Sequence, residues 1–486
     1  MLVSWEQLYQ RSLQSILPSL EKIRGVFVGF NTNIDAIFQL SPAFFEKQIN
    51  DLALSETTLQ QAIHNWKGTI EDLSDFVTGI CGCFKEGKAS EWIIKDEHVY
   101  EKLLLQLPLE IATFKMGGQA GIMANLLAQM DLQKIITHCV SLNKQQLSLF
   151  SKSNSIVVPL ENQNKELLLL PPHEIKATEE SPYYHLIFEL RKNNHLQISS
   201  DTCWTCPREN RFIATYDPKN ASLTLLDGFR NHVSEIAQIT DAFFIAGFHL
   251  LAQQSMEKIH QKIHQINDLL LQAKESNHQL IIHWEMSSTK NPLILDQLLK
   301  TTEKNHIWTS LGCNERELKE LLEALGFTKL CSSFHLLESI LQGILHIVDH
   351  LALARFHLHT YGYYLEVVKK PHTLLAEQIR DSLCFSSVIT AIRAAKGNLP
   401  PKKELLDFGI SLIRSFSPSK PYRQMKNLLE NSTEIQTTSE KGIFETKDYS
   451  IIIIPTILVS SPKFTVGLGD AISSSALVAE LASKYG

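Results

Sequence analysis

The sequence contains no apolar run long enough to cross a membrane, which takes ~20 residues. Its longest apolar stretch, residues 451–459, includes Pro455 and fits a buried strand. Residues 1–23 have the pattern of an amphipathic helix, in which polar side chains such as Glu6 and Arg11 exclude the apolar core of a signal peptide. We therefore expect a cytoplasmic protein with no membrane partner.

The chain also lacks an excess of positive charge. It has 46 Lys and Arg against 52 Asp and Glu, a net charge of −6 and a pI near 6.3. No cluster of Lys or Arg alternates with aromatic residues, which excludes nucleic acid as a partner. A phosphorylated small molecule could bind only where the fold concentrates positive groups or recruits a metal ion.

Cysteine is sparse and scattered, and there is no internal repeat or low-complexity tract. Eight cysteines in a chain without a secretion signal are expected to be reduced thiols. Two local pairs, Cys81 with Cys83 and Cys203 with Cys206, leave a zinc or redox site as an alternative to incidental thiols. A length of 486 residues predicts one large domain with an appended lid, or two to three domains.

Short apolar runs alternate with helical patterns from about residue 241 onward, which predicts a parallel sheet covered on both faces. The expected strands there are 241–247, 279–285, 306–311 and 355–361. The expected helices are 255–273, 314–324, 336–345 and 371–396. Residues 54–66 and 69–77 also look helical, and 430–446 reads as a surface loop. The turn-rich β segments between about 155 and 220 break this rhythm, so we assign them to a second sheet, joined by residues near 31–115.

The most informative segment is Val-Gly-Leu-Gly-Asp-Ala-Ile-Ser-Ser-Ser at 466–475. A β-rich run precedes it and a helical pattern of small residues follows. A glycine turn that leads into a helix presents free backbone N–H groups to an anion. Asp470 would repel a phosphate, but it is suited to take a proton from a hydroxyl while the N–H groups hold a phosphoryl group. The tetrapeptide alone also fits a simple turn with an Asp cap.

Two further segments offer groups for a ligand. Asn33 and Asp35 lie where the first strand is expected to end, and such a pair suits sugar hydroxyls, although an Asx turn is the simpler explanation. Gly118 and Gln119 precede the expected helix 121–130, where backbone N–H groups and an amide could face a ligand. Helix packing against a tight turn is the alternative for that second segment.

Three acidic residues are expected at one edge of the predicted sheet. Glu285 ends one expected strand, Glu317 follows the next, and Asp470 opens the last helix. Carboxylates gathered at one edge repel one another unless a cation holds them, and Mg²⁺ fits. Asn314 and Glu317 equally form a capping-box pattern. Arg211 could clamp a phosphate or make a surface ion pair. His359 lies on an expected strand, where a buried and hydrogen-bonded histidine is the usual explanation.

Eight segments together resemble the ADP-dependent sugar kinases, which are the ADP-specific glucokinases and phosphofructokinases of the ribokinase-like superfamily. They occur in the family's order across nearly the whole chain. The segments are GFNTNIDAI (29–37), MGGQAGIMANLLA (116–128), YHLIFEL (184–190), ENRFI (209–213), HWE (283–285), SLGCNERE (310–317), RFHLHT (355–360) and TVGLGDAIS (465–473).

The resemblance implies a ribokinase-like three-layer α/β/α sandwich with a smaller β-rich lid. It implies a discontinuous lid of about 34–115 and 160–220, and a nucleotide-binding core mainly of 116–155 and 221–486. Asp470 matches the catalytic base, and Glu285, Glu317 and Asp470 match positions that support Mg²⁺. The positions that match the binding site for ADP, the phosphoryl donor, are Arg211, Asn314, His359, Thr360, Val459, Gly467 and Gly469. The positions that match the sugar site are Asn33, Asp35, Glu91, Gly118, Gln119 and His185.

We expect glucose as the acceptor, because relatives that use free glucose resemble this chain at Glu91 and His185. A carboxylate beside a sugar hydroxyl accepts a hydrogen bond but repels a sugar phosphate. An ADP-dependent 6-phosphofructokinase is the first alternative, a catalytically silent sugar- or nucleotide-binding regulator the second, and ATP as donor a third. The preference for ADP comes from the resemblance alone. The expected partners are a small-molecule sugar and nucleotide, and we expect a monomer.

Overall fold

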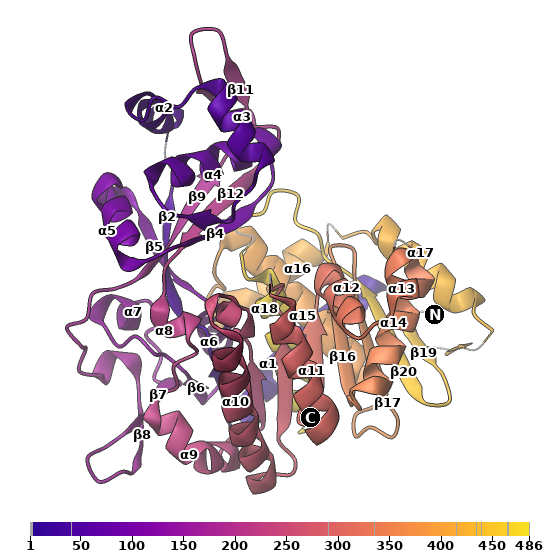
Figure 1. Cartoon of the computed structure of the whole chain (residues 1–486). Helices are drawn as coiled ribbons and strands as arrows, with labels where there is room; N and C mark the ends of the chain where they lie inside the picture. Colours follow the sequence, from indigo (N-terminus) through magenta and orange to yellow (C-terminus); the bar gives the residue numbers. More distant parts are fainter. Residues whose placement is uncertain are drawn as a thin grey trace.

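Two β-sheets organise the chain, and each has its own hydrophobic core (Figure 1). The computed structural model describes residues 3–39, 41–289, 291–334, 336–414, 416–433, 435–438, 440–463 and 466–485. Within these ranges the larger sheet has twelve strands and the smaller one six. No helix in the same ranges has the length and apolarity that a membrane span requires.

The larger sheet carries a parallel centre with antiparallel strands at both edges. Its order is β18 (Gln436–Thr437), β19 (Ile443–Glu445), β20 (Tyr449–Pro455), β17 (Tyr363–Lys369), β16 (Arg355–His359), β15 (Ser310–Cys313), β14 (Ile281–Glu285), β13 (Ala242–Ile245), β1 (Val26–Gly29), β6 (Ile135–Thr137), β7 (Ile156–Glu161) and β8 (Leu167–Leu170). All pairs from β7 to β16 are parallel. The chain leaves β1 toward β6 first and toward β13 later, and such a reversal opens a crevice at the carboxyl ends of the strands.

Helices cover both faces of this sheet. One group consists of α1 (Trp5–Ser19), α6 (Gln119–Gln129), α15 (Ala376–Lys396), α16 (Lys402–Ile413) and α18 (Leu468–Ser483), which contact one another. The second group runs through α9 (Asp227–Gln238), α10 (Met256–Ser276), α11 (Pro292–Asn305), α12 (Glu315–Ala324), α14 (Leu337–His350) and α17 (Lys420–Asn431). The predicted three-layer α/β/α architecture is confirmed (Figure 1).

The smaller sheet lies above the larger one in Figure 1, and its own helices pack against its strands. Its strands, in order, are β3 (Thr69–Ile70), β4 (Ser90–Ile94), β12 (Asn210–Thr215), β9 (Tyr184–Leu190), β2 (Asn33–Phe38) and β5 (Thr113–Gly117). Its helices are α2 (Pro42–Asp51), α3 (Glu56–His64), α4 (Leu73–Glu86) and α5 (Glu97–Gln106). Every second residue of these strands, such as Phe188 and Phe212, belongs to the second core. The intervening residues of each strand therefore face away from that core.

The short elements complete the description. A hairpin of β10 (His195–Gln197) and β11 (Cys203–Thr205) extends from the smaller sheet. The remaining α-helices are α7 (Lys144–Ser148), α8 (Pro218–Ala221) and α13 (Thr328–Ser332). Four 3-10 turns are η1 (Leu20–Lys22), η2 (Leu109–Ile111), η3 (Pro172–Glu174) and η4 (Phe248–Gln253).

Three local expectations differ from the structure. Residues 160–170, assigned to the lid from sequence, lie on the larger sheet because β8 pairs with β7. Thr69 and Ile70 form strand β3, and the helix expected to begin there starts at Leu73. The expected loop 430–446 contains the end of α17 and two strands, β18 and β19; Glu434 and Ser439 of that segment lie outside the described residues.

Candidate functional site

A cleft of about 390 Å³ lies where the two sheets face each other. All but two of the candidate residues from the sequence line it. They are Asn33, Asp35, Glu91, Gly118, Gln119, His185, Arg211, Glu285, Asn314, Glu317, His359, Gly467, Gly469 and Asp470. Residues from both ends of the chain therefore meet at one place, which is the geometry that a site for two substrates requires.

Thr360 and Val459 are the two candidates that do not line this cleft. The Thr360 hydroxyl donates to the Tyr363 carbonyl at 2.7 Å and accepts from the Tyr363 N–H at 3.0 Å, so it closes the turn between β16 and β17. Val459 is half-buried against the main core. Their contacts in the described structure hold the fold together.

The small-sheet wall presents polar groups on strands β2, β9 and β4. Asp35 on β2 is in register with His185 on β9, and Glu91 on β4 is in register with Ile213 on β12. The sequence placed Asn33 and Asp35 at the exit of the first strand, but the structure places them within β2. Because strand residues alternate between the faces, Asp35, His185 and Glu91 all point to the cleft side.

Burial shapes the charges of this wall. It raises the pKa of Asp35 to about 6, against smaller opposing effects of His185 and of the Asn33 amide, which donates to Asp35 Oδ1 at 2.7 Å. Burial disfavours the charged form of His185, but the neighbouring carboxylates, above all Asp217, raise its pKa overall. His185 Nε2 lies 3.7 Å from Asp217 Oδ2. The wall thus holds an acceptor and a donor beside each other.

The turn before α6 forms the floor between the walls. Gly118 has a φ of +74°, and a Cβ there would lie 2.4 Å from the Asn31 carbonyl oxygen, so this turn requires glycine. Gln119 opens the helix, and its Oε1 accepts a 2.7 Å hydrogen bond from the Ser287 hydroxyl. The amide therefore ties α6 to the segment that follows β14.

The large-sheet wall gathers three carboxyl groups. Burial raises the pKa of Glu285 well above its ordinary range, and the charges of Asp470 and Glu317 add to the effect. Burial also raises the pKa of Glu317 to about 7, although backbone N–H groups of Asn314 and Ser288 donate to its carboxylate. The capping box of Asn314 and Glu317 is present as the sequence pattern indicates. Positive charge is needed here if all three groups are to ionise together.

Asp470 lies in the first turn of α18, which begins after Gly467. Gly467 has a φ of +67°, and a Cβ at Gly469 would lie 3.0 Å from His359 Nε2. Burial raises the pKa of Asp470, while the Gln119 amide and the charge of Arg393 act in the opposite direction. The unpaired N–H groups of a first helical turn carry partial positive charge, so a carboxylate and an anion-binding helix end lie side by side.

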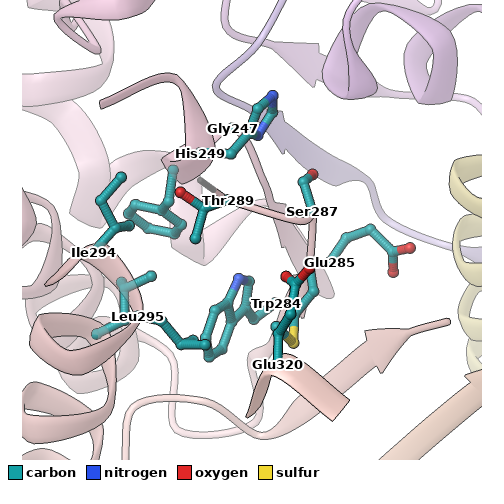
Figure 2. A pocket seen from close by; sticks show the side chains of 12 residues that line it. Gly247, His249, Trp284, Glu285, Ser287, Thr289, Ile294, Leu295 and Glu320 are labelled. Carbon is teal, nitrogen blue, oxygen red and sulfur yellow. The ribbon is translucent and has the colours of Figure 1, made fainter. Parts of the chain in front are cut away.

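Two other cavities adjoin the cleft. A larger one of about 790 Å³ shares Asp35, Ile187 and Arg211 with it and is also lined by Arg191, Arg208 and Lys463. A small one of about 20 Å³ lies beside β14 and is lined by Trp284 together with Ile294 and Leu295 from α11 (Figure 2). The small cavity has room for a water molecule but not for a sugar.

Sequence reasoning missed several lining residues. They are Asn31, Ile122, Ile187, Ile213, His249, Leu250, Met286, Ser287 and Val466. His249 follows β13 in the turn η4, and a polar residue after the carboxyl end of a parallel strand was a usable signal. The apolar members carry no such signal, because an isoleucine that faces a ligand looks like any core isoleucine.

The cysteines lie apart from this site, and all eight are free thiols. Cys81, Cys83 and Cys206 are buried, whereas Cys203 is exposed. In the part of the chain that the structure describes, no group of three or more His, Cys, Asp or Glu side chains is arranged as a ready metal site. Mg²⁺ does not need one, since it usually binds through one or two carboxylates together with substrate phosphates.

Comparison with known proteins assigns the chain to one family. Residues 24–479 match the model of the ADP-specific phosphofructokinase/glucokinase conserved region. An ADP-dependent glucose/glucosamine kinase of Pyrococcus furiosus is 29% identical over 482 residues, which cover 98% of each chain. An ADP-specific phosphofructokinase of Methanosarcina acetivorans is 29% identical over 489 residues, which cover 98% of this chain and 97% of that one. The chain belongs to the ADP-specific phosphofructokinase/glucokinase family.

Solved structures agree with this assignment. The reconstructed last common ancestor of ADP-dependent phosphofructokinases from Methanosarcinales superposes with a TM-score of 0.81 at 29% identity and covers 98% of both chains. An ADP-dependent kinase in complex with fructose-6-phosphate and ADPβS gives a TM-score of 0.81 at 27% identity over 99% of both chains. At the level that these relatives share, the protein is an ADP-dependent sugar kinase.

Proposed function

We propose that this kinase transfers the β-phosphoryl group of ADP to the 6-hydroxyl of glucose, which yields glucose 6-phosphate and AMP. The observation that supports glucose is the carboxylate of Glu91 on the cleft side of the small sheet, near Asp35 and His185. Asp35 and Glu91 accept hydrogen bonds from sugar hydroxyls. Both would repel the phosphate of a phosphorylated sugar.

The large-sheet wall suits the nucleotide phosphates. Arg211 reaches the cleft from β12, and α18 presents its N-terminal end beside Asp470. Glu285 and Glu317 would hold Mg²⁺, because a cation would offset the repulsion among the buried carboxyls. When bound, the ion supplies charge neutralisation at the transferring phosphoryl group.

Asp470 is the proposed base. It accepts the proton of the C6 hydroxyl as that oxygen bonds to the β-phosphorus, and the bridging P–O bond breaks with its electron pair leaving on AMP. The backbone N–H groups from Gly467 to Asp470 and the guanidinium of Arg211 stabilise negative charge on the transferring group. We expect closure of the smaller sheet over the cleft to exclude water, which would otherwise accept the phosphoryl group.

Fructose 6-phosphate is the second candidate acceptor, and one observation favours it. The adjoining cavity carries Arg191, Arg208 and Lys463 close to the sugar wall, where they could bind a sugar phosphate. Glu91 opposes this candidate, because a carboxylate on the same wall repels the phosphate.

A matrix of donors and acceptors tests the proposal. ADP and ATP are each assayed against glucose, glucosamine and fructose 6-phosphate, with formation of AMP or ADP as the readout. We expect the highest kcat/KM for ADP with glucose. A higher value for fructose 6-phosphate would transfer the assignment to the second candidate. Thermal stabilisation by glucose without turnover of any pair would indicate a silent regulator.

A further inference from the structure

A chain of buried polar side chains runs from the interior of the larger sheet to the carboxylate of Glu285. We propose that Ser310 and Arg355 are positioning residues of the kinase reaction, which act through His283 to fix the orientation of Glu285 at the cleft. The inference rests on the proposed function for the role of Glu285 in binding the divalent cation. Neither Ser310 nor Arg355 lines the cleft.

The contacts form an unbroken line across neighbouring strands. Arg355 Nη1 donates to Ser310 Oγ at 3.1 Å, and Ser310 Oγ lies 2.8 Å from His283 Nδ1. His283 Nε2 in turn lies 3.1 Å from Glu285 Oε2. Ser310 and His283 are fully buried, and Glu285 is 2% exposed. Bulk solvent therefore does not compete for the links of this chain.

The anchor of the chain is an ion cluster. Arg355 Nη2 lies 2.8 Å from Glu366 Oε2 on β17 and 2.7 Å from Glu480 Oε1 on α18. Both carboxylates accept from Nε and Nη2 of Arg355, so they hold the guanidinium in one orientation. The same helix, α18, carries Asp470 at its N-terminal end. The ion cluster and the chain of contacts therefore connect the helix that bears the proposed base to the strand that bears Glu285.

The donor directions follow from the chemistry of the groups. Arginine only donates, so Ser310 Oγ accepts from Arg355, and its own hydrogen is directed to His283 Nδ1. A neutral imidazole that accepts at Nδ1 carries its proton on Nε2 and donates it to Glu285 Oε2. The imidazole thereby holds one carboxylate oxygen of Glu285, which fixes the direction of the side chain. A histidine of this kind is what orients a metal-binding group in many proteins.

Strand β15 confines Glu285 from another side. Gly312 is in register with Glu285, and a Cβ at Gly312 would lie 2.3 Å from Glu285 Oε2 and 3.0 Å from His283 Nε2. A methyl group here would displace the end of the glutamate side chain. Substitutions at Ser310 and at Gly312 can therefore each disturb the carboxylate of Glu285 without replacing the glutamate itself.

The test compares Ser310→Ala and Gly312→Ala with the parent chain. We expect each to raise the Mg²⁺ concentration at half-maximal rate by about tenfold or more, with KM for glucose within about twofold. Binding of Mn²⁺ to the complex with ADP, followed by the EPR signal of the free ion, should weaken by a similar factor. Ser310→Thr keeps the hydroxyl on a residue that strands favour and should restore parental metal binding.

The control for Ser310→Ala is Ser12→Ala, which removes another fully buried hydroxyl whose bond, to the Leu8 carbonyl at 2.7 Å, lies within α1. It should lower the melting temperature without a change in metal binding. Parental Mg²⁺ and Mn²⁺ titrations for Ser310→Ala, together with a shifted titration for Glu285→Gln, would overturn the positioning role alone. An unshifted titration for Glu285→Gln would instead remove the proposed role of Glu285.

Discussion

The two walls of the cleft carry the same functional group, a carboxylate, in opposite settings. On the large-sheet wall, Glu285 and Glu317 are buried close to Asp470, and mutual repulsion adds to burial in raising the pKa of Glu285. On the small-sheet wall, Glu91 is exposed and Asp35 lies in register with His185, whose pKa is raised. Among the described residues no Lys or Arg of the larger sheet lines the first wall, and Arg355 and Arg393 act on its carboxyls from outside the lining. The second wall has His185 in its lining beside the buried acid.

This difference separates two tasks. A wall that gathers buried carboxyls opposes their joint ionisation, and a bound cation relieves that cost. A wall that pairs acceptors with a donor matches sugar hydroxyls without a cation. Substitutions on the large-sheet wall should therefore change turnover and metal dependence, and those on the small-sheet wall should change stability and sugar affinity.

The largest expected effect is on the large-sheet wall. Asp470→Asn removes the proposed base and should lower kcat by at least about a hundredfold, within the range of general-base catalysis. Glucose binding, measured by calorimetry, should stay nearly parental because the amide keeps the shape of the carboxylate. Turnover within about tenfold of the parent would assign proton removal to another group.

The next effect is on stability and depends on pH. Burial raises the pKa of Asp35 from 3.8 to about 6, so the ionised group destabilises the fold above that pH and does not below 3.8. Asp35→Asn should gain about 3 kcal/mol at pH 8 and about half of that at pH 5. Urea midpoints at the two pH values measure it. Asp51→Asn, an exposed change in the same lid, is the control, and an equal gain at both pH values would contradict the explanation.

A smaller effect is expected at the edge of the sugar wall. Glu91→Gln keeps a hydrogen-bond acceptor but loses the charge, and should raise KM for glucose by about tenfold with kcat within about twofold. Activity with fructose 6-phosphate should rise, because the repulsion of its phosphate is removed. A fall in kcat with KM unchanged would place Glu91 with the catalytic groups. It would contradict the assignment of sugar binding to the small-sheet wall and of catalysis to the large-sheet wall.

The smallest effect concerns the cysteines of the lid. The described residues contain no cluster of three or more metal-binding side chains, so a strong zinc chelator should leave the melting temperature of the protein unchanged. Cys203→Ala, at an exposed thiol, should be neutral within about 0.5 kcal/mol. A drop in melting temperature on chelation would revive the zinc alternative for the Cys203 and Cys206 pair.

Local patterns in the sequence were sufficient for much of the core and for the turns at the site. The alternation of apolar runs and helices predicted the parallel strands β13 to β16, and the capping pattern predicted the start of α12. Gly118 and Gly467, which adopt positive φ, were identified from their place before a helix. These features depend on neighbours a few residues apart, which any single sequence records.

Only the tertiary structure decided which distant strands pair. It placed β8 on the larger sheet, brought Glu91 beside Ile213, and joined Arg355 through Ser310 to His283. Register and pairing depend on the summed packing of whole faces, and no short window of sequence contains that sum. The sequence by itself determined the chemical groups and the local turns that present them, whereas long-range packing decided which of those groups meet.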